Sequence, residues 1–181
     1  MKIVSGLYGG RRLNVPKGRD IRPTSDKIRG AVFNMLASRG AVDDAYVLDA
    51  FCGTGALGLE ALSRGASSAI FWDKSRESLS LAKSNAEMLG ADKTVFQIKD
   101  ASKVGVRPDN IVQSNLVFLD PPYNKDLIAP TLNALVAGGW LSQDVWILCE
   151  SERKHDLSLP EGFSVDHEKI YGETKIVLLR S

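Results

Sequence analysis

Short apolar runs alternate with segments of helical spacing along most of the chain, and this alternation limits the possible fold more than any other feature. The apolar runs predict strands at residues 46–51, 68–73, 94–98, 116–120 and 145–150, and the spacing predicts helices at 56–65, 76–90 and 126–139. Continuous apolar strands that alternate with helices are typical of a parallel sheet covered on both faces. We therefore expect an α/β fold.

The two ends of the chain depart from this pattern. Residues 163–170 and 174–180 flank a "YGE" turn, so we expect a hairpin that ends the sheet with an antiparallel strand. Turn signals break residues 1–20 into short strand-like pieces, and a helix is predicted from Thr24 to about Ala37, with Thr24 or Ser25 as N-cap. The expected organisation is a hairpin-and-helix extension over 1–40 and a main domain over 41–181, packed as a single compact unit.

The bulk composition excludes several classes of protein. A chain of 181 residues that is 44% hydrophobic and 25% charged is not disordered throughout. No apolar stretch approaches the roughly 20 residues of a membrane span, and the polar N-terminus does not resemble a signal peptide. The two cysteines indicate a reducing cytoplasm, and no Cys or His has metal-ligand spacing. We expect a cytoplasmic monomer without a metal ion.

Positive charge is concentrated near the N-terminus. Residues 1–39 carry nine Lys and Arg against two acids, a local balance of +7, whereas the rest of the chain sums to −6. A basic end of this kind fits a polyanionic partner such as a nucleic acid. A solvated surface without a partner explains the charge equally well at this stage.

A glycine-rich stretch lies between the first predicted strand and the helix that follows it. Gly53, Gly55 and Gly58 form a G-x-G-x-x-G pattern, which lets the backbone approach a ligand at the helix N-terminus. The pattern alone does not separate a dinucleotide from other nucleoside ligands. Asp49 lies near the end of the preceding predicted strand, where a carboxylate would repel a pyrophosphate but attract the ammonium and sulfonium groups of S-adenosylmethionine.

Two further acids follow the next strands. Asp73 stands 20 residues after Gly53, where an acid can accept hydrogen bonds from ribose hydroxyls, and Asp100 can accept from an adenine amino group. Each acid alone fits a helix cap or a loop residue. Because ligands of open α/β sheets bind at the carboxyl ends of the strands, the three acids together favour a nucleoside site at one edge.

The fourth strand ends in an unusual string, "NLVFLDPPYN", at residues 115–124. Pro121 and Pro122 remove two backbone donors, so that Asp120 and the neighbouring carbonyls form a surface made of acceptors. Such a surface suits an –NH₂ group, whose lone pair it can direct toward the sulfonium methyl. Tyr123 offers a face for stacking against a base turned out of its helix. A strand-end turn with Tyr123 in the core is the structural alternative.

These motifs resemble those of class I S-adenosylmethionine-dependent methyltransferases, and the D-P-P-Y string resembles enzymes that methylate exocyclic base amines. The RsmD-type family is resembled most clearly at residues 22–36, 49–66 and 171–179. The similarity to this family covers nearly the whole chain. The resemblance implies a Rossmann-like, seven-stranded sheet with a reversed last strand. It also implies methyl transfer from S-adenosylmethionine to N2 of one guanine in 16S ribosomal RNA of the small subunit.

The resemblance also implies roles for individual residues. The expected cofactor residues are Asp49, Gly53, Gly55, Asp73, Asp100 and Ala101, and the expected holders of the target amine are Asp120, Pro121, Pro122 and Tyr123. Arg22 and Thr24 are expected near the cofactor or target base, and Arg11, Arg12 and Lys17 on RNA phosphates. Two positions depart from the family pattern, since Cys52 replaces an expected alanine and Ser75 the usual aspartate.

Other functions share some of these features. A DNA amino-methyltransferase acting on adenine N6 or cytosine N4 has the same D-P-P-Y string, but no added segment here is large enough to read a DNA sequence. An assembly factor that binds the cofactor without catalysis would not need that string. Methylation of a protein glutamine also requires an amide –NH₂ to be held, although the basic N-terminal segment favours nucleic acid.

Overall fold

The computed structural model describes residues 1–16, 25–123 and 125–181. Within these residues seven strands form one sheet, in the order β3-β2-β1-β4-β5-β7-β6. The strands are β1 Tyr46–Asp49, β2 Ser68–Asp73, β3 Thr94–Ile98, β4 Ser114–Leu119, β5 Leu141–Glu152, β6 Ser164–Tyr171 and β7 Thr174–Arg180. The helices are α1 Asp26–Ala37, α2 Ala56–Ser63, α3 Arg76–Leu89, the short 3-10 helix η1 Ala101–Lys103 and α4 Ile128–Ala137. The predicted α/β architecture is confirmed.

The strands β1 to β5 are parallel, and β7 is antiparallel to both of its neighbours, β5 and β6. The predicted antiparallel last strand is therefore confirmed, but it lies inside the sheet while β6 occupies the edge. Strands β4 and β5 begin earlier than their apolar runs, because Ser114 pairs with Leu141 ahead of a register shift in the ladder. The helix expected from residue 126 begins at Ile128, since Asp126 adopts a positive φ of 45°.

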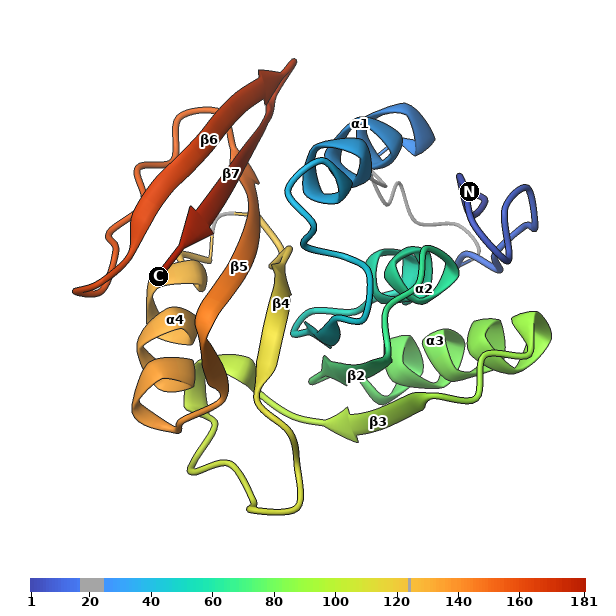
Figure 1. Cartoon of the computed structure of the whole chain (residues 1–181), viewed down its shortest axis with the longest axis horizontal. Helices are drawn as coiled ribbons and strands as arrows, with labels where there is room; N and C mark the ends of the chain where they lie inside the picture. Colours follow the sequence, from blue (N-terminus) through green and yellow to red (C-terminus); the bar gives the residue numbers. More distant parts are fainter. Residues whose placement is uncertain (17–24, 124) are drawn as a thin grey trace.

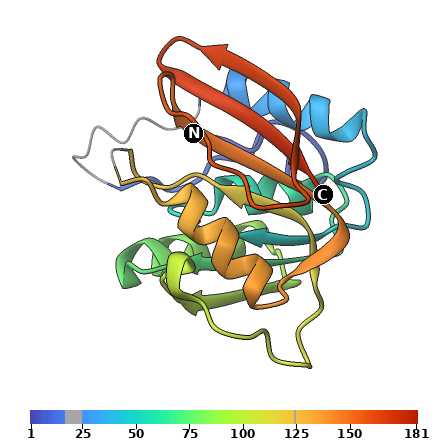
Figure 2. The same cartoon turned by 90° about the vertical axis from the view of Figure 1, so that its left-hand side faces the viewer.

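The sheet separates two apolar cores. Helices α1, α2 and α3 pack on one face around Phe33, Leu59 and Phe118, and α4 packs on the other around Trp72 and Leu132 (Figure 1). Figure 2 shows α4 crossing its face of the sheet. Burial of these large apolar side chains, each worth about 1.5–3 kcal/mol, supplies most of the driving force for folding.

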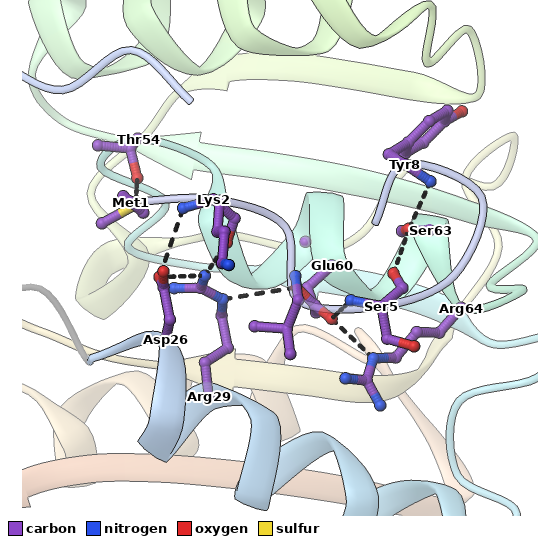
Figure 3. Close-up of polar contacts among 12 residues, drawn as sticks. Met1, Lys2, Ser5, Tyr8, Asp26, Arg29, Thr54, Glu60, Ser63 and Arg64 are labelled. Atoms are coloured by element: carbon purple, nitrogen blue, oxygen red, sulfur yellow. Dashed lines mark hydrogen bonds and ion pairs between the residues drawn. The ribbon is translucent and has the colours of Figure 1, made fainter. Parts of the chain in front are cut away.

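The N-terminal segment is fastened to α2 by polar contacts (Figure 3). Its predicted hairpin is reduced to one antiparallel bridge between Lys2 and Arg12. The backbone N–H groups of Val4 and Ser5 donate to the carboxylate of Glu60 at 2.7 and 3.1 Å. Ser63 on the same helix accepts a hydrogen bond from the Tyr8 N–H at 2.9 Å.

A buried arginine connects this segment to α1. The Arg29 guanidinium is 1% exposed, pairs with Asp26 at 2.8 Å and donates to the Lys2 carbonyl. Its Nε lies 3.6 Å from Glu60, which is fully buried and also pairs with Arg64 at 2.7 Å. Breaking a buried pair leaves an uncompensated charge, so this network holds α1, α2 and the N-terminus together.

The start of the N-terminal helix α1 agrees with the sequence prediction. Ser25 is the N-cap of α1 and accepts from the Ile28 N–H at 3.2 Å, as predicted, whereas Thr24 lies outside the described residues. No helix in the described part of the chain is long and apolar enough to cross a membrane. The division at residue 40 remains a prediction.

Gly58 of the glycine motif lies in α2 against the side chain of Phe71. A Cβ atom at Gly58 would stand 2.4 Å from the Phe71 ring, which is itself stacked on Phe96 with ring centroids 4.9 Å apart. The ring has little room to move, because interiors are closely packed. Gly58 therefore permits the close approach of α2 to β2.

We predict that Gly58→Ala destabilises the fold by roughly 1–3 kcal/mol, because overpacking outweighs the gain in helix propensity. Chemical denaturation measures the free energy of unfolding. Gly105→Ala is the matched control, since a Cβ there meets no atom within 4 Å. Equal stability of Gly58→Ala and the parent would contradict the proposed packing role.

Candidate active site

One cavity of about 1030 Å³ opens at the carboxyl ends of β1, β2, β4 and β5. Nine of the residues predicted to bind the cofactor or the target amine line it: Asp49, Gly53, Asp73, Asp100, Ala101, Asp120, Pro121, Pro122 and Tyr123. The remaining one, Gly55, is the N-cap residue of α2 beside the cavity. A space of this volume admits a nucleoside ligand together with part of a second substrate.

Two acids hold the glycine loop in place. Gly53 and Gly55 have positive φ angles of 52° and 80°, which only glycine adopts without strain. The Gly53 N–H donates to Oδ2 of Asp73 and the Gly58 N–H donates to Oδ2 of Asp49, both at 3.0 Å. A carboxylate has about four acceptor positions, so each acid retains capacity for a ligand.

Asp73 and Asp100 lie at neighbouring strand ends. Asp73 also accepts from the Ser75 N–H at 2.8 Å. Asp100 accepts from the Ser102 hydroxyl at 2.6 Å, and this hydrogen bond, aided by Lys74, lowers its pKa below the usual range. An ionised Asp100 is an acceptor only, as an adenine amino group requires.

The two departures from the family pattern have structural explanations. Ser75 is the N-cap of α3, where its hydroxyl accepts from the Ser78 N–H at 3.2 Å. Cys52 lines the cavity, and burial, reinforced by the charges of Asp49 and Asp73, raises the pKa of its thiol. The thiol therefore stays protonated and acts as a small apolar group.

Three carboxylates lie close together where the cavity meets β1, β4 and β5, those of Asp49, Asp120 and Glu150. Burial is the main cause that raises the pKa of Asp49 to about 7. Burial likewise raises the pKa of Asp120 well above its usual range, and the neighbouring charges of Glu150 and Asp49 raise it further. Desolvated like charges disfavour ionisation, so this part of the cavity favours a cation or a cluster of N–H donors.

Tyr123 bridges the D-P-P-Y string to the antiparallel end of the sheet. Its hydroxyl donates to Oε1 of Glu150 at 3.4 Å and lies 3.1 Å from the Thr174 hydroxyl. The ring is half-buried rather than part of the core. Glu150 was not among the predicted site residues, although it ends the apolar run "VWILCE" as Asp120 ends its own.

The basic residues of the N-terminal segment differ in their surroundings. Arg11 donates to the carbonyl oxygens of Leu89, at 2.8 Å, and Met88, where it stabilises the C-terminus of α3. Arg12 is exposed beside that contact. Lys17, Arg22 and Thr24 lie outside the described residues. The predicted contacts of these residues with RNA or cofactor stay predictions.

The N-terminal segment also contributes to the cavity wall. Met1 and Pro16 of this segment line the cavity, together with Arg29 of α1. Among the described residues, no group of three or more His, Cys, Asp or Glu side chains is arranged to hold a metal ion. The site combines carboxylates, carbonyls, backbone N–H groups and aromatic surface with the cationic side chains of Arg29, Lys74, Lys99 and Lys125.

The strand order, the antiparallel β7 and the glycine loop define the fold of S-adenosylmethionine-dependent methyltransferases. Magnesium protoporphyrin IX methyltransferase from Synechocystis, solved with bound S-adenosylmethionine, shares this fold with a TM-score of 0.63. It is 18% identical, and the match covers 89% of this chain and 81% of that one. At this identity the likeness concerns the fold alone.

The family model described as Conserved hypothetical protein 95 matches residues 1–180, and the chain belongs to this family. Ribosomal RNA small subunit methyltransferase D from Escherichia coli K12 is 37% identical over 175 residues, 96% of this chain and 86% of the relative. The Haemophilus influenzae protein of the same name is 30% identical over 95% of this chain and 89% of its own. The solved structure of yhhF from Escherichia coli matches with a TM-score of 0.86 and 35% identity, over 99% and 97% of the two chains. The RsmD-type family predicted from the sequence is confirmed.

The raised pKa of Asp49 predicts a specific dependence of stability on pH. The folded protein keeps this proton up to about pH 7, while the unfolded carboxyl loses it near its ordinary value of 3.8. The contribution of Asp49 to stability is therefore present at low pH and is lost as the pH rises toward and through 7.

We predict that Asp49→Asn does not show this loss. Its free energy of unfolding, relative to that of the parent, should therefore rise by on the order of 2–4 kcal/mol between pH 4 and pH 8. Asparagine keeps an oxygen that can accept from the Gly58 N–H. Denaturant unfolding without ligand, carried out at several pH values, measures the difference. If the difference in free energy of unfolding between the variant and the parent does not change with pH, Asp49 is ionised in the folded protein over this whole pH range, which contradicts the prediction.

Proposed function

We propose that the protein transfers a methyl group from S-adenosylmethionine to the exocyclic N2 amine of one guanine in 16S ribosomal RNA of the small ribosomal subunit. The observation that carries the proposal is the single cavity that joins the glycine loop to Asp120–Tyr123. The names of the bacterial relatives, which are small-subunit ribosomal RNA methyltransferases, support the RNA substrate.

The residues of the cavity fit the methyl donor. S-adenosylmethionine supplies a methyl carbon made electrophilic by its attachment to a sulfonium. Asp49 and the glycine loop would hold the methionine end, Asp73 the ribose, and Asp100 with Ala101 the adenine. The buried carboxylates match the ammonium and sulfonium charges, which offset the cost of keeping acids ionised in a desolvated site.

The target amine would lie against Asp120 and the Pro121 carbonyl. Neither proline has an N–H, so this part of the wall accepts hydrogen bonds without competing donors. Hydrogen bonds from the amine favour a tetrahedral nitrogen with its lone pair directed at the methyl carbon. Most of the rate acceleration is expected from this alignment and from the electrostatics of the pocket.

The reaction balances with the groups at hand. The C–N bond forms as the C–S bond breaks, and the sulfur leaves as the neutral thioether of S-adenosylhomocysteine. The methylated nitrogen then gives up one proton, and Asp120 is placed to accept it. Burial and the charges of Glu150 and Asp49 raise the pKa of Asp120, which makes its carboxylate a stronger proton acceptor.

The basic N-terminal segment, residues 1–39, is the proposed RNA-binding part of the protein. The +7 balance of residues 1–39 suits a phosphate backbone, with contacts by Arg11, Arg12 and Lys17 and with Arg22 and Thr24 near the base or cofactor. Such contacts position an RNA without reading its sequence. The partner is ribosomal RNA in the small subunit or an assembly intermediate, and the protein acts as a monomer in the cytoplasm.

The substrate class is tested by nucleoside mass spectrometry of ribosomal RNA from cells with and without the gene. We expect loss of N2-methylguanosine at one site of 16S RNA, restored by the parent gene. Purified protein should methylate small-subunit particles and not duplex DNA. Methyl incorporation into DNA alone would instead support the amino-methyltransferase of adenine or cytosine.

We predict that Asp120→Ala lowers turnover by roughly 10²-fold or more, because the amine loses its charged acceptor. Affinity for S-adenosylmethionine, measured by calorimetry, is expected to stay within about threefold, a change of less than 1 kcal/mol. Asp144→Ala, at an exposed aspartate of β5, is the control and keeps the parent rate. Turnover by Asp120→Ala at the parent rate would overturn the mechanism and leave only a binding role.

A further inference from the structure

Glu150 lies beside Asp120 in the cavity. Glu150 belongs neither to the glycine motif nor to the D-P-P-Y string, so these motifs assign it no role. Leu119 and Cys149 are paired in the parallel register of β4 and β5, so the next residues, Asp120 and Glu150, are also neighbours. Adjacent strands lie about 4.8 Å apart. Leu119 and Cys149 pack on the α4 side, and because side chains alternate, both acids turn toward the side of α1–α3.

The carboxylate of Glu150 is buried and oriented. The side chain belongs to a residue only 5% exposed that lines the cavity. The Tyr123 hydroxyl donates to its Oε1 at 3.4 Å, and the hydroxyl of Thr174 lies 3.1 Å from the same Tyr123 oxygen. A carboxylate offers about four acceptor positions, so Glu150 can receive more than one N–H or O–H donor.

Asp120, the Pro121 carbonyl and Glu150 thus form two adjacent acceptor positions in one wall. Their natural complement is a pair of neighbouring N–H donors on one planar edge. Guanine presents such a pair, because its N2 amine is next to the ring N1–H. In adenine and cytosine the ring nitrogen beside the exocyclic amine is an acceptor, which a carboxylate repels.

We propose that Glu150 selects guanine by accepting a hydrogen bond from the ring N1–H while Asp120 and the Pro121 carbonyl hold the N2 amine. This inference rests on the proposed function and names the residue that sets its base specificity. A site built to hydrogen-bond a donor rejects an analogue that lacks it, because the buried acceptor is left unsatisfied. The same pair of acceptors explains why the D-P-P-Y string need not mean an adenine substrate.

The test uses small subunits assembled with 16S RNA that carries either guanosine or 2-aminopurine riboside at the nucleotide that the parent protein methylates. 2-Aminopurine keeps the amine, but its N1 is an acceptor. We expect the parent to prefer guanine by about 10²-fold or more in kcat/KM. Equal rates of the parent on the two bases would overturn the inference without any variant.

Glu150→Gln provides the second measurement, because glutamine has the same size and its amide can donate to the N1 of 2-aminopurine. We expect a loss on guanine and a shift of the guanine to 2-aminopurine ratio by at least about tenfold toward 2-aminopurine. Affinity for S-adenosylmethionine stays unchanged. Glu161→Gln, at an exposed glutamate, is the control and keeps the parent preference.

The remaining outcomes separate the possible failures. If Glu150→Gln loses activity on both bases in the same proportion, Glu150 only supports Tyr123 and the inference is wrong. It is equally wrong if Glu150→Gln keeps the parent preference. If the parent methylates no guanine in any small-subunit particle, the proposed function itself fails, and this inference fails with it.

Discussion

The parallel register of the central strands is the constraint on which the site depends. It brings the last residue of β1, the residue after β4 and the buried end of β5 to one edge, so that Asp49, Asp120 and Glu150 share a desolvated space. Keeping such charges together is unfavourable, as the raised pKa values of Asp49 and Asp120 show. Apolar burial on both faces of the sheet sustains this arrangement. A cationic methyl donor and an edge of N–H groups would supply positive charge to the cluster of Asp49, Asp120 and Glu150.

The second structural device is the connection between the N-terminal segment and α2. Glu60 is fully buried, receives two backbone N–H groups of that segment and pairs with Arg64, and Arg29 lies beside it. Arg29 and Met1 also line the cavity. Because the same contacts fix residues 1–16 and one wall of the site, this described part of the N-terminal segment is held next to the proposed chemistry.

Much of this site was predictable because it follows from the ends of apolar strands. Asp49, Asp73 and Asp120 could be placed on one edge once the sheet was known to be parallel. Glu150 carries the same signal, an acid after an apolar run, but no motif draws attention to it. Glu60 could not be found, since its backbone partners stand 55 and 56 residues away. Arg11 has a contact that its charge alone does not indicate, because its guanidinium donates to a carbonyl at the C-terminus of α3.

The most direct test of the central claim is a crystal structure of the protein with S-adenosylmethionine bound. If the buried acids and the acceptor wall belong to one reaction centre, the adenine lies beside Asp100 and the methionine ammonium beside Asp49. The sulfonium methyl then points at the gap next to Asp120 and the Pro121 carbonyl, open for an incoming amine. A ligand bound with its methyl group directed away from that gap, or bound outside the cavity, would contradict the account.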